Sequence, residues 1–435
     1  MKILVLTYGT RGDVQPFVAL CKELTSAGHS VTLATAARFE ALATAQDVHF
    51  AALSDELLGI IDTQQGRRAM EGANGFWGML RVNFELMRRV KPLQIELVED
   101  CWEVAKANRP DVIIFHPKAF AAYAVSEVLN VPLIMALLVP MLVPTRTAPH
   151  LGFPDLKVGK WYNALTHLAV RQLMRLPARG ILNTWCMRHG FGKQSLKLFV
   201  DGTGARIPVV AGFSGSVIPR PDDWPKNSFM SGFWFLESRK SETLSADVEA
   251  FLQEGEPPIC FGFGSMAGSD PERLRQTILE ALAETGQRGM ILTGWGGISA
   301  GKPRADLIEI EAAPHDLLLP RVSMLVHHGG AGTTAAALRA GTPQIVIPFM
   351  GDQPFWGQRM MELGVAPAPI RQNRLTAENL KQAIQSVLKG PEFRTSATRL
   401  SEKIRSENGA RRAADFIDAV LENPSELQQF EHQGQ

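Results

Sequence analysis

The stretch HHGGAGTTAAALRAGTPQIVIPFMGDQPFWGQRM, residues 327–360, decides the fold class, because it alternates a strand end, a glycine turn, a helix, a second strand and an acidic loop. An apolar strand precedes it from Met324, and the alanine-rich helix ends at Gly341. Backbone N–H groups at the start of such a helix are unpaired and carry the positive end of the helix dipole, so they attract a diphosphate. The pattern therefore predicts an α/β domain with a phosphate-binding site at this turn.

Two polar residues, Asp352 and Gln353, follow the second strand of this stretch. Ligands of open parallel sheets bind at the carboxyl ends of the strands, so both side chains should reach the same edge as the glycine turn. An acid and an amide side by side suit sugar hydroxyls. The residues alone leave a second interpretation open, because a glycine turn before a helix is also common packing chemistry. Paired histidines such as His327 and His328 often only end a strand.

A second informative stretch, MKILVLTYGTRGDVQPFVALCKELTSAGHSVTLAT, opens the chain and predicts strand, loop, helix and strand over residues 1–35. A dinucleotide-binding fingerprint has the same outline but needs three glycines and an acidic residue after the second strand. Only Gly9 and Gly12 are present, and the second strand runs into LATAAR without an acidic residue. NAD is therefore not an expected cofactor.

Together the two stretches resemble the motifs of inverting GT-B glycosyltransferases in the UDP-glycosyltransferase superfamily, closest to its bacterial natural-product and sterol glucosyltransferase branch. The donor motif of that family, H-x-G-x-[NG]-[ST], is matched from His328 to Thr333, and its acceptor-side motif, G-[HD]-x-x-P, from Gly12 to Pro16. More than three hundred residues separate the two matches, which occur in the order of the family. The resemblance implies the GT-B fold, in which two Rossmann-like parallel-sheet domains face a central cleft.

The resemblance also implies a set of donor-binding residues. In the family a histidine touches the diphosphate, an Asp-Gln pair holds the sugar hydroxyls, and a serine after an F-G turn binds phosphate. Two departures concern the nucleoside: the W-x-P-Q segment of the family reads A-A-P-H at residues 312–315, and Ala336 stands where plant relatives have a ribose-binding glutamate. Trp295 is therefore a substitute candidate for stacking on the base. The predicted donor-binding residues are Ser265, Trp295, His315, His328, Gly330, Gly332, Thr333, Thr334, Asp352 and Gln353.

Asp13 is the predicted catalytic base. An inverting transfer needs one group that takes the proton of the acceptor hydroxyl as this hydroxyl attacks the anomeric carbon. An unperturbed aspartate has a pKa near ~3.9, so it is charged at pH 7 and a weak base, which burial beside an apolar acceptor would strengthen. Asp13 would also serve as a cap of the following helix, and the two roles are compatible. His116, at a strand end, is a second candidate that would orient Asp13 or contact the acceptor, unless it is structural.

The apolar run VPLIMALLVPMLVP, residues 131–144, contains three prolines and is shorter than the ~20 residues of a membrane helix. It predicts a buried strand followed by a loop, and the resemblance implies that this loop lines the acceptor pocket. Core packing would give a similar composition. Residues 54–90, the variable part of the N-terminal half, would shape the mouth of the pocket. The predicted acceptor-binding residues are Phe76, Trp77, Met135, Leu138 and Met141.

Residues 145–200 have a helix-like periodicity with many basic and aromatic side chains. Basic groups alternate there with Trp161, Leu165, Leu168 and Leu173. This pattern leaves two interpretations, a helix that contacts a membrane surface or an amphipathic helix packed on the N-terminal domain. The second interpretation is the simpler one and is preferred.

Length and composition agree with two domains, because 435 residues exceed what one hydrophobic core usually holds and 45% hydrophobic residues can fill two. Periodicity disappears where Pro219, Pro221 and Pro225 cluster, which predicts a linker. A helix at 376–388 and the segment from Arg394 to about Leu421 are expected to cross back and brace the first domain. The predicted segments are an N-terminal acceptor-binding domain at 1–215, a linker at 216–243, a C-terminal nucleotide-sugar-binding domain at 244–415, and a helix end and tail at 416–435.

The remaining features bear on partners and location. A net charge of +1 gives no electrostatic case for nucleic acid. Four cysteines without zinc or C-x-x-C spacing predict reduced thiols and a cytoplasmic protein. Met1 runs directly into a core strand, so no signal peptide is expected. No metal ion or cofactor is expected, because the helix dipole and polar groups would hold the diphosphate; monomer and homodimer both stay open.

These observations predict an enzyme that moves a hexose, glucose from UDP-glucose, to a hydroxyl of a lipophilic small molecule such as a sterol, terpenoid or polyketide, with inversion. One alternative is a dTDP-deoxysugar transferase, for example a rhamnosyltransferase, of glycolipid or antibiotic biosynthesis. Another is a non-catalytic protein that binds a nucleotide sugar or a lipid. The non-catalytic alternative is disfavoured, because acceptor-side and donor-side groups are both present.

Overall fold

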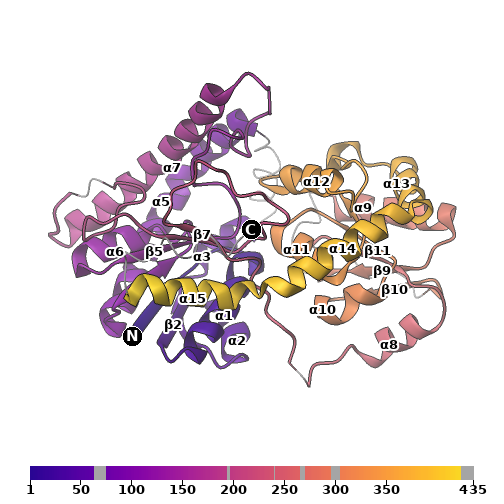
Figure 1. Ribbon diagram of the computed structural model, residues 1–435, viewed down its shortest axis with the longest axis horizontal. Helices are drawn as coiled ribbons and strands as arrows, with labels where there is room; N and C mark the ends of the chain where they lie inside the picture. Colours follow the sequence, from indigo (N-terminus) through magenta and orange to yellow (C-terminus); the bar gives the residue numbers. More distant parts are fainter. Residues whose placement is uncertain (63–74, 194–195, 240, 265–269, 295–303, 423–435) are drawn as a thin grey trace. The chain divides into compact units, whose positions relative to one another are not determined.

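The structure, a computed structural model, describes residues 1–62, 75–193, 196–239, 241–264, 270–294 and 304–422, with side chains except at 61–62 and 75–89. These residues form two compact units, whose elements are labelled in Figure 1. Unit 1 holds the described residues up to Leu236 and from Glu407 onward, and unit 2 holds those of Glu237–Ser406. Each unit is described by itself below.

Unit 1 is built on a seven-stranded sheet in the order β3-β2-β1-β4-β5-β6-β7, and every neighbouring pair is parallel. The central strands are buried along almost their whole length, as expected of a parallel sheet that helices cover on both faces. The strands are β1 (Lys2–Leu6), β2 (Ser30–Ala36), β3 (His49–Leu53), β4 (Val112–Phe115), β5 (Leu133–Leu137), β6 (Val209–Ala211) and β7 (Ser228–Met230).

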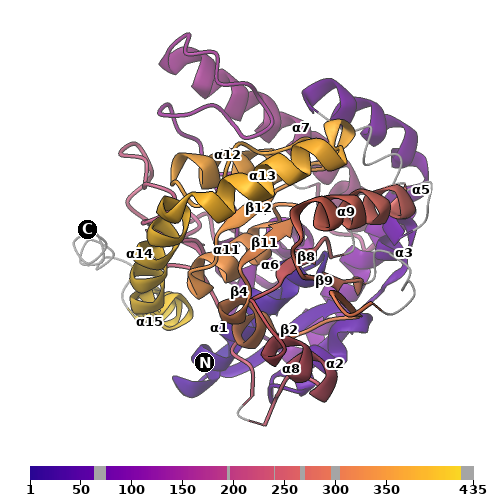
Figure 2. The ribbon, with the colours of Figure 1, turned by 90° about the vertical axis from the view of Figure 1, so that its right-hand side faces the viewer.

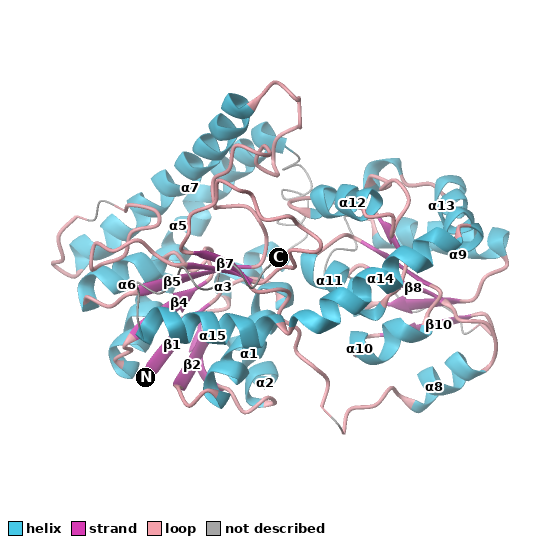
Figure 3. Ribbon diagram, viewed as in Figure 1, coloured by secondary structure: helices cyan, strands magenta, loops and turns pink. Residues whose placement is uncertain are grey.

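Helices connect these strands, as Figure 3 shows by colour. The first of them buries Val14, Phe17, Val18, Cys21 and Leu24, which recur every three or four residues and so share one face. The sequence therefore fixes which side of this helix meets the sheet. The helices of unit 1 are α1 (Arg11–Ser26), η1 (Ala37–Phe39), α2 (Glu40–Thr44), α3 (Glu56–Asp62), α5 (Gly75–Asn108), α6 (Ala121–Leu129), α7 (Lys160–Arg188) and α15 (Gly409–Glu422).

The last described helix, α15, packs against α1 although some four hundred residues separate them (Figure 1). Asp418 Oδ1 of α15 lies 2.6 Å from Nε2 of His29, and the ring of Phe416 stacks on that of Phe229 with centroids 5.0 Å apart. The prediction that the end of the chain braces the first domain is confirmed for α15 alone, because helix 376–388 and residues 394–406 belong to unit 2. The chain re-enters unit 1 at Glu407, whereas the sequence predicted that the C-terminal domain continues to residue 415.

The stretch predicted as a linker, residues 216–243, is in part a piece of unit 1. Its strand β7 extends the sheet beside β6, and Trp234 packs edge-on against Phe17 with ring centroids 5.6 Å apart. Unit 1 therefore reaches Leu236. A strand of three residues is too short to show an alternating pattern in the sequence, and the prolines before it suggest a break instead.

Unit 2 contains a five-stranded parallel sheet in the order β10-β9-β8-β11-β12. Alternate residues of a strand face opposite sides, so Ile259 and Phe261 of β8 join one buried cluster and Cys260 joins another. Both faces are thus covered, and Figure 2 shows α9 and α13 side by side over this sheet. The strands are β8 (Ile259–Gly262), β9 (Gly289–Leu292), β10 (Leu307–Ile310), β11 (Met324–His327) and β12 (Gln344–Val346).

The helices of unit 2 fill the connections between these strands and continue beyond the last one. The longest, α14, runs from unit 2 up to the point where the chain returns to unit 1. In order they are α8 (Ala246–Gln253), α9 (Pro271–Thr285), α10 (His315–Leu318), η3 (Leu319–Arg321), α11 (Ala331–Ala340), α12 (Gln353–Glu362), η4 (Gln372–Arg374), α13 (Ala377–Lys389) and α14 (Pro391–Glu407).

The cysteines and the apolar character of the helices bear on two expectations from the sequence. Cys21, Cys101, Cys186 and Cys260 are all buried and form no disulfide. In the part of the chain that the structure describes, no helix combines the length and the apolar character needed to cross a bilayer.

We predict that Phe416→Ala destabilises unit 1. Phe416 is 1% exposed and holds α15 on the sheet, so its removal leaves a cavity and should lower the free energy of unfolding by about 3–5 kcal/mol. The measurement is a chemical denaturation curve followed by tryptophan fluorescence. Leu388→Ala is the control, because Leu388 is 44% exposed and its loss should change stability by less than about 0.5 kcal/mol. Equal midpoints for the two variants would contradict the bracing role of α15.

Candidate active site

The start of α11 forms the centre of the candidate donor site in unit 2. Gly330 is the N-cap residue, and the first intrahelical bond runs from the N–H of Thr334 to the carbonyl of Gly330 at 2.9 Å. The N–H groups of Ala331, Gly332 and Thr333 therefore have no carbonyl within the helix to bind. The helix begins at Ala331, and Gly332 is exposed at its first turn.

Two glycines allow the turn before this helix. Gly329 has φ +86°, and a Cβ there would lie 2.7 Å from Cγ1 of Val346. A Cβ on Gly330 would meet the imidazole of His328. The close approach of β11 to its own following helix thus requires glycine at both positions.

The two histidines of this turn have different surroundings. His327 is fully buried; its Nε2 lies 2.8 Å from Oε1 of Gln344, and its Nδ1 accepts the N–H of Gly329 at 3.2 Å. Burial lowers the pKa of His327 to about 3. His327 is therefore a neutral histidine that joins β11 to β12, which is the structural role that the sequence left open.

His328 is half-buried beside the first turn of α11. Burial is the largest cause that lowers its pKa, to about 4, so the imidazole is neutral at pH 7. Its Nδ1 has no hydrogen-bond partner among the described residues. A neutral imidazole keeps one N–H donor, which suits an anionic oxygen held at the helix start.

Gln353 and Asp352 lie where β12 leads into α12. Oε1 of Gln353 accepts the N–H groups of Phe349 and Met350, at 2.8 and 3.1 Å, which fixes the orientation of the carboxamide. Its Nε2 donates to no other described residue, so this amide group remains for a ligand. Oδ2 of Asp352 accepts the indole N–H of Trp356 at 2.8 Å, which holds the carboxylate at the start of α12.

Of the other predicted donor residues, the structure describes the two threonines and His315 but not Ser265 and Trp295. Thr333 is half-buried at the helix start, whereas Thr334 is fully buried and its hydroxyl has no partner among the described residues. His315 begins α10 and lies close enough to lower the pKa of His328. Ser265 and Trp295 lie outside the described residues, although Gly264 and Gly294 before them lie together: a Cβ on Gly294 would be 3.0 Å from the carbonyl oxygen of Gly264.

In unit 1 the candidate catalytic residue is Asp13, in the first turn of α1. Its Oδ2 accepts the backbone N–H of Thr10 at 2.8 Å, and its own N–H donates to the carbonyl of Thr10. The cap role is therefore real, and it fixes the carboxylate. Gly9, with φ +144°, must be glycine, because any Cβ there would collide with the carboxylate of Asp13.

The second oxygen of Asp13 meets groups that follow β4, the strand beside β1. Nζ of Lys118 donates to Oδ1 at 2.7 Å, and Nε2 of His116 lies 3.9 Å from the same oxygen, too far for a hydrogen bond. His116 is held in place by the backbone N–H of Lys118 on its Nδ1 and by the edge of Phe17. The strand order thus brings the two sequence-predicted residues, Asp13 and His116, together.

These neighbours decide the ionisation of the site. Burial raises the pKa of Asp13, but the positive charge of Lys118 and the imidazole of His116 outweigh it, so the pKa lies below its ordinary value. Burial lowers the pKa of His116 to about 4. At pH 7 Asp13 is a carboxylate and His116 is neutral. The expectation that burial beside an apolar acceptor strengthens Asp13 as a base stays a prediction. In the free protein Lys118, which the sequence analysis missed, keeps the pKa of Asp13 low.

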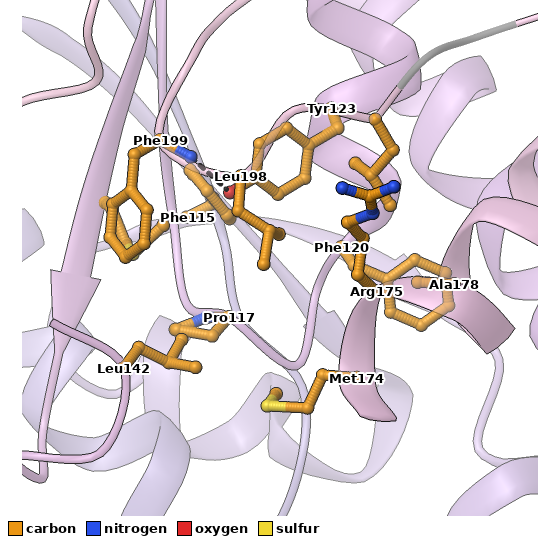
Figure 4. A pocket seen from close by; sticks show the side chains of 12 residues that line it. Phe115, Pro117, Phe120, Tyr123, Leu142, Met174, Arg175, Ala178, Leu198 and Phe199 are labelled. Carbon is orange, nitrogen blue, oxygen red and sulfur yellow. Dashed lines mark hydrogen bonds between the residues drawn. The ribbon is translucent and has the colours of Figure 1, made fainter. Parts of the chain in front are cut away.

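The predicted acceptor residues do not form one cluster. Met135 lines a cavity of about 60 Å³ with Phe115, Leu142, Met174 and Phe199, most of which Figure 4 shows. Leu138 belongs to the core cluster of unit 1 instead, and Met141 lies half-buried in the loop after β5 without lining the cavity. Phe76 and Trp77 lie in α5, where side chains are outside the described residues.

Comparisons with known proteins accord with this geometry. Residues 3–146 match the family described as Glycosyltransferase family 28 N-terminal domain, and residues 305–417 match Erythromycin biosynthesis protein CIII-like, C-terminal domain. A sterol 3-beta-glucosyltransferase of Arabidopsis thaliana is 34% identical over 98% of this chain and 69% of its own length. The chain belongs to the UDP-glycosyltransferase superfamily. The predicted family, one of sugar-transferring enzymes, is confirmed.

Other relatives are longer than this glycosyltransferase chain. A second sterol 3-beta-glucosyltransferase of Arabidopsis thaliana is 34% identical over 94% of the chain and 64% of its own length. One from Aspergillus clavatus is 32% identical over 99% of the chain but only 30% of its own length. The chain thus spans about two thirds of the plant relatives and under a third of the fungal one.

Solved structures confirm the fold of this glycosyltransferase. The glycotransferase of kitacinnamycin has a TM-score of 0.71 at 18% identity, covering 97% of this chain and 99% of the other. The calicheamicin glycosyltransferase CalG4 has a TM-score of 0.66 at 17% identity, covering 97% and 98%. The predicted GT-B fold, an α/β architecture of two parallel sheets, is confirmed.

We predict that Lys118→Met raises the pKa of Asp13. The ammonium group stabilises the carboxylate, so its removal makes protonation easier and moves the titration to higher pH. The measurement is a ¹³C NMR titration of labelled aspartate carboxyls, with the Asp13 signal assigned by its loss in Asp13→Asn. Lys106→Met is the matched control, since Lys106 pairs with Glu103 at 2.6 Å and its side chain is similarly exposed. An unchanged Asp13 titration in Lys118→Met would contradict this electrostatic account.

Proposed function

We propose that this glycosyltransferase moves glucose from UDP-glucose to a hydroxyl of a lipophilic small molecule of the sterol class, with inversion at the anomeric carbon. The observation that carries the proposal is the 34% identity to a sterol 3-beta-glucosyltransferase over 98% of the chain. The catalytic-type carboxylate at the start of α1 and the anion-binding turn at the start of α11 support it.

The donor side of the proposal rests on the start of α11. Free N–H groups of Ala331, Gly332 and Thr333, the positive end of the helix dipole and the neutral His328 would bind the diphosphate and stabilise the charge that it gains on leaving. Nε2 of Gln353 and the carboxylate of Asp352 would hold the sugar hydroxyls. Ser265, Trp295 and His315 stay predicted contacts to phosphate and base.

The acceptor side rests on Asp13. Its Oδ2 is held by Thr10, so Oδ1 is the oxygen that would receive the proton of the acceptor hydroxyl. Lys118 occupies Oδ1 in the free protein, but its side chain is 56% exposed and can turn into solvent as an acceptor binds. Loss of this ion pair would raise the pKa of Asp13 and strengthen the base when the acceptor is present.

The proposed reaction is one displacement. The acceptor oxygen forms a bond to the anomeric carbon as the bond from that carbon to the diphosphate breaks, and the proton of the hydroxyl passes to Asp13. The leaving diphosphate is already acidic and needs no proton donor. His116, neutral and packed beside Asp13, would position this carboxylate rather than take the proton.

In this proposal the nucleotide sugar is a cosubstrate, and the helix start with His328 supplies the charge stabilisation for the diphosphate without a metal ion or further cofactor. We place the enzyme in the cytoplasm, because its four cysteines form no disulfide. The donor is proposed as UDP-glucose; a dTDP-deoxysugar is the alternative that the assay below separates.

We predict that Asp13→Asn lowers sugar transfer by about 10²–10⁴-fold while UDP binding is kept, because the amide caps α1 but takes no proton. The measurement is mass spectrometry of products from UDP-glucose, UDP-galactose or dTDP-rhamnose with a panel of sterols, macrolides and flavonoids. Asp111→Asn is the control: Asp111 also accepts a backbone N–H, from Lys2 at 2.7 Å, at the amino ends of β1 and β4. Full transfer by Asp13→Asn would refute the base role, and UDP binding without any product would favour the non-catalytic alternative.

A further prediction concerns the diphosphate. His328→Ala should raise the Kd for UDP by about 10–100-fold, the effect of losing a hydrogen bond to a charged group. Because the pKa of His328 is lowered to about 4, the affinity for UDP-glucose, whose diphosphate does not titrate near neutral pH, should not change around pH 6.5, where an unperturbed histidine titrates. Isothermal titration calorimetry measures both effects, with His49→Ala, an exposed histidine of β3, as control. Unchanged affinity in His328→Ala would place the diphosphate elsewhere.

A further inference from the structure

Exposed apolar side chains gather on one element of unit 1. Of the described residues that are large, apolar and exposed, only Met1 and Leu388 lie outside the segment 156–187. The exposed fractions in this segment run from 40% to 66%, the highest being Trp161. Its exposed apolar residues are Leu156, Val158, Trp161, Leu165, Leu168, Met174, Leu176 and Met187.

Four of these side chains form a stripe along α7. Trp161 is the first of them, and the leucines at 165, 168 and 176 follow it by four, seven and fifteen residues. At about 3.6 residues per turn all four lie on one face of the helix. The other face is already packed in unit 1, because Ile181, Leu182 and Trp185 are buried and Trp185 meets Trp102 of α5 with ring centroids 5.8 Å apart. The helix thus packs on its domain, as the simpler interpretation of the sequence expects, and a second apolar face is left exposed.

The segment that carries the stripe is basic, although two carboxylates lie beside it: Asp155 pairs with Lys157 at 2.6 Å, and Glu99 of α5 lies 2.7 Å from His189. Residues 156–200 contain eight lysines and arginines and no aspartate or glutamate, although the whole chain has a net charge of only +1. None of the five basic residues of α7 forms an ion pair with a described residue. These five are Lys160, Arg171, Arg175, Arg179 and Arg188.

The positive charge of this segment favours an anionic partner. A helix with an apolar face, flanking arginine and lysine and an exposed tryptophan is the pattern that lies in the plane of an anionic membrane surface. A second copy of the chain fits poorly, because two such segments would bring eight positive charges against eight. An apolar partner protein would need no such charge.

A cavity of unit 1 lies beside the same helix. Met174 and Arg175 of α7 line it together with Phe115, Leu142 and Phe199, as Figure 4 shows. At about 60 Å³ it is smaller than the ~300–1,000 Å³ pockets that hold whole ligands, so it would take one apolar part of a molecule. A lipophilic molecule at a membrane beside α7 would therefore be close to an apolar site of unit 1.

We propose that the α7 stripe, Trp161, Leu165, Leu168 and Leu176 with the basic side chains around it, docks on an anionic lipid bilayer. The apolar side chains enter the boundary between headgroups and acyl chains, and the basic groups bind lipid phosphates. Vesicle binding needs no sugar transfer, so this proposal stands or falls separately from the proposed function.

The test is sedimentation of the full chain with vesicles of phosphatidylcholine alone or with one third phosphatidylglycerol. Anionic vesicles should bind at least about tenfold more protein, and salt raised to about 0.5 M should remove most of the difference. The combined variant Trp161→Ser, Leu165→Ser, Leu168→Ser should lose binding. Its matched control is Leu388→Ser, an exposed leucine of α13, which should bind like the parent protein.

A second variant guards against misfolding of the first. Lys160→Glu with Arg179→Glu changes only exposed charges and should reduce binding to anionic vesicles while the melting temperature is unchanged. Equal binding to both vesicle types, or binding that survives either variant, overturns the proposal. A stable dimer in sedimentation velocity that the triple variant converts to monomer would show that a second copy covers the stripe, and would also overturn it.

Discussion

Parallel pairing of the strands is the constraint on which the candidate site residues of each unit depend. In a parallel sheet all strands end at the same edge, so residues that follow neighbouring strands meet there whatever their distance in sequence. In unit 1 the pairing of β1 with β4 brings Asp13 to His116 and Lys118. In unit 2 the pairing of β11 with β8 and β12 brings the turn at His328 to the loops that carry Gly264 and Gln353.

The carboxylate of Asp13 shows how one residue can serve fold and chemistry together. One oxygen caps α1 through Thr10, which fixes the position of the group, and the other accepts Lys118, which an acceptor hydroxyl would replace in the proposed reaction. An ion pair that lowers the pKa keeps the carboxylate ionised before the acceptor arrives. In unit 2, by contrast, the two histidine side chains are uncharged: burial keeps His327 and His328 neutral. The positive potential there comes from the start of the helix.

Local motifs predicted the parts of this protein that local geometry determines. The glycine turn, His328 and the cap at Asp13 could be found because each depends on a few adjacent residues. Lys118 could not, since its contact with Asp13 spans 105 residues and exists only because β1 pairs with β4. Strand β7 is too short to show a periodic pattern in the sequence. The sequence also could not tell which face of α7 is buried, because this depends on the packing of Trp185 against Trp102. Leu138 packs in the core cluster because alternation along β5 and its continuation places it on the same side as Ile134 and Ala136.

The central claim, a single displacement with Asp13 as the only base, is tested most directly by the configuration of the sugar in the product. UDP-glucose carries an α linkage, so one attack from the opposite side must give a β-glucoside. The measurement is the ¹H NMR coupling of the anomeric proton in the glucoside formed from a sterol acceptor. A β-glucoside is the result that the account predicts. An α-glucoside would contradict it, because retention requires a second displacement or a front-side attack for which Asp13 is not the acting group.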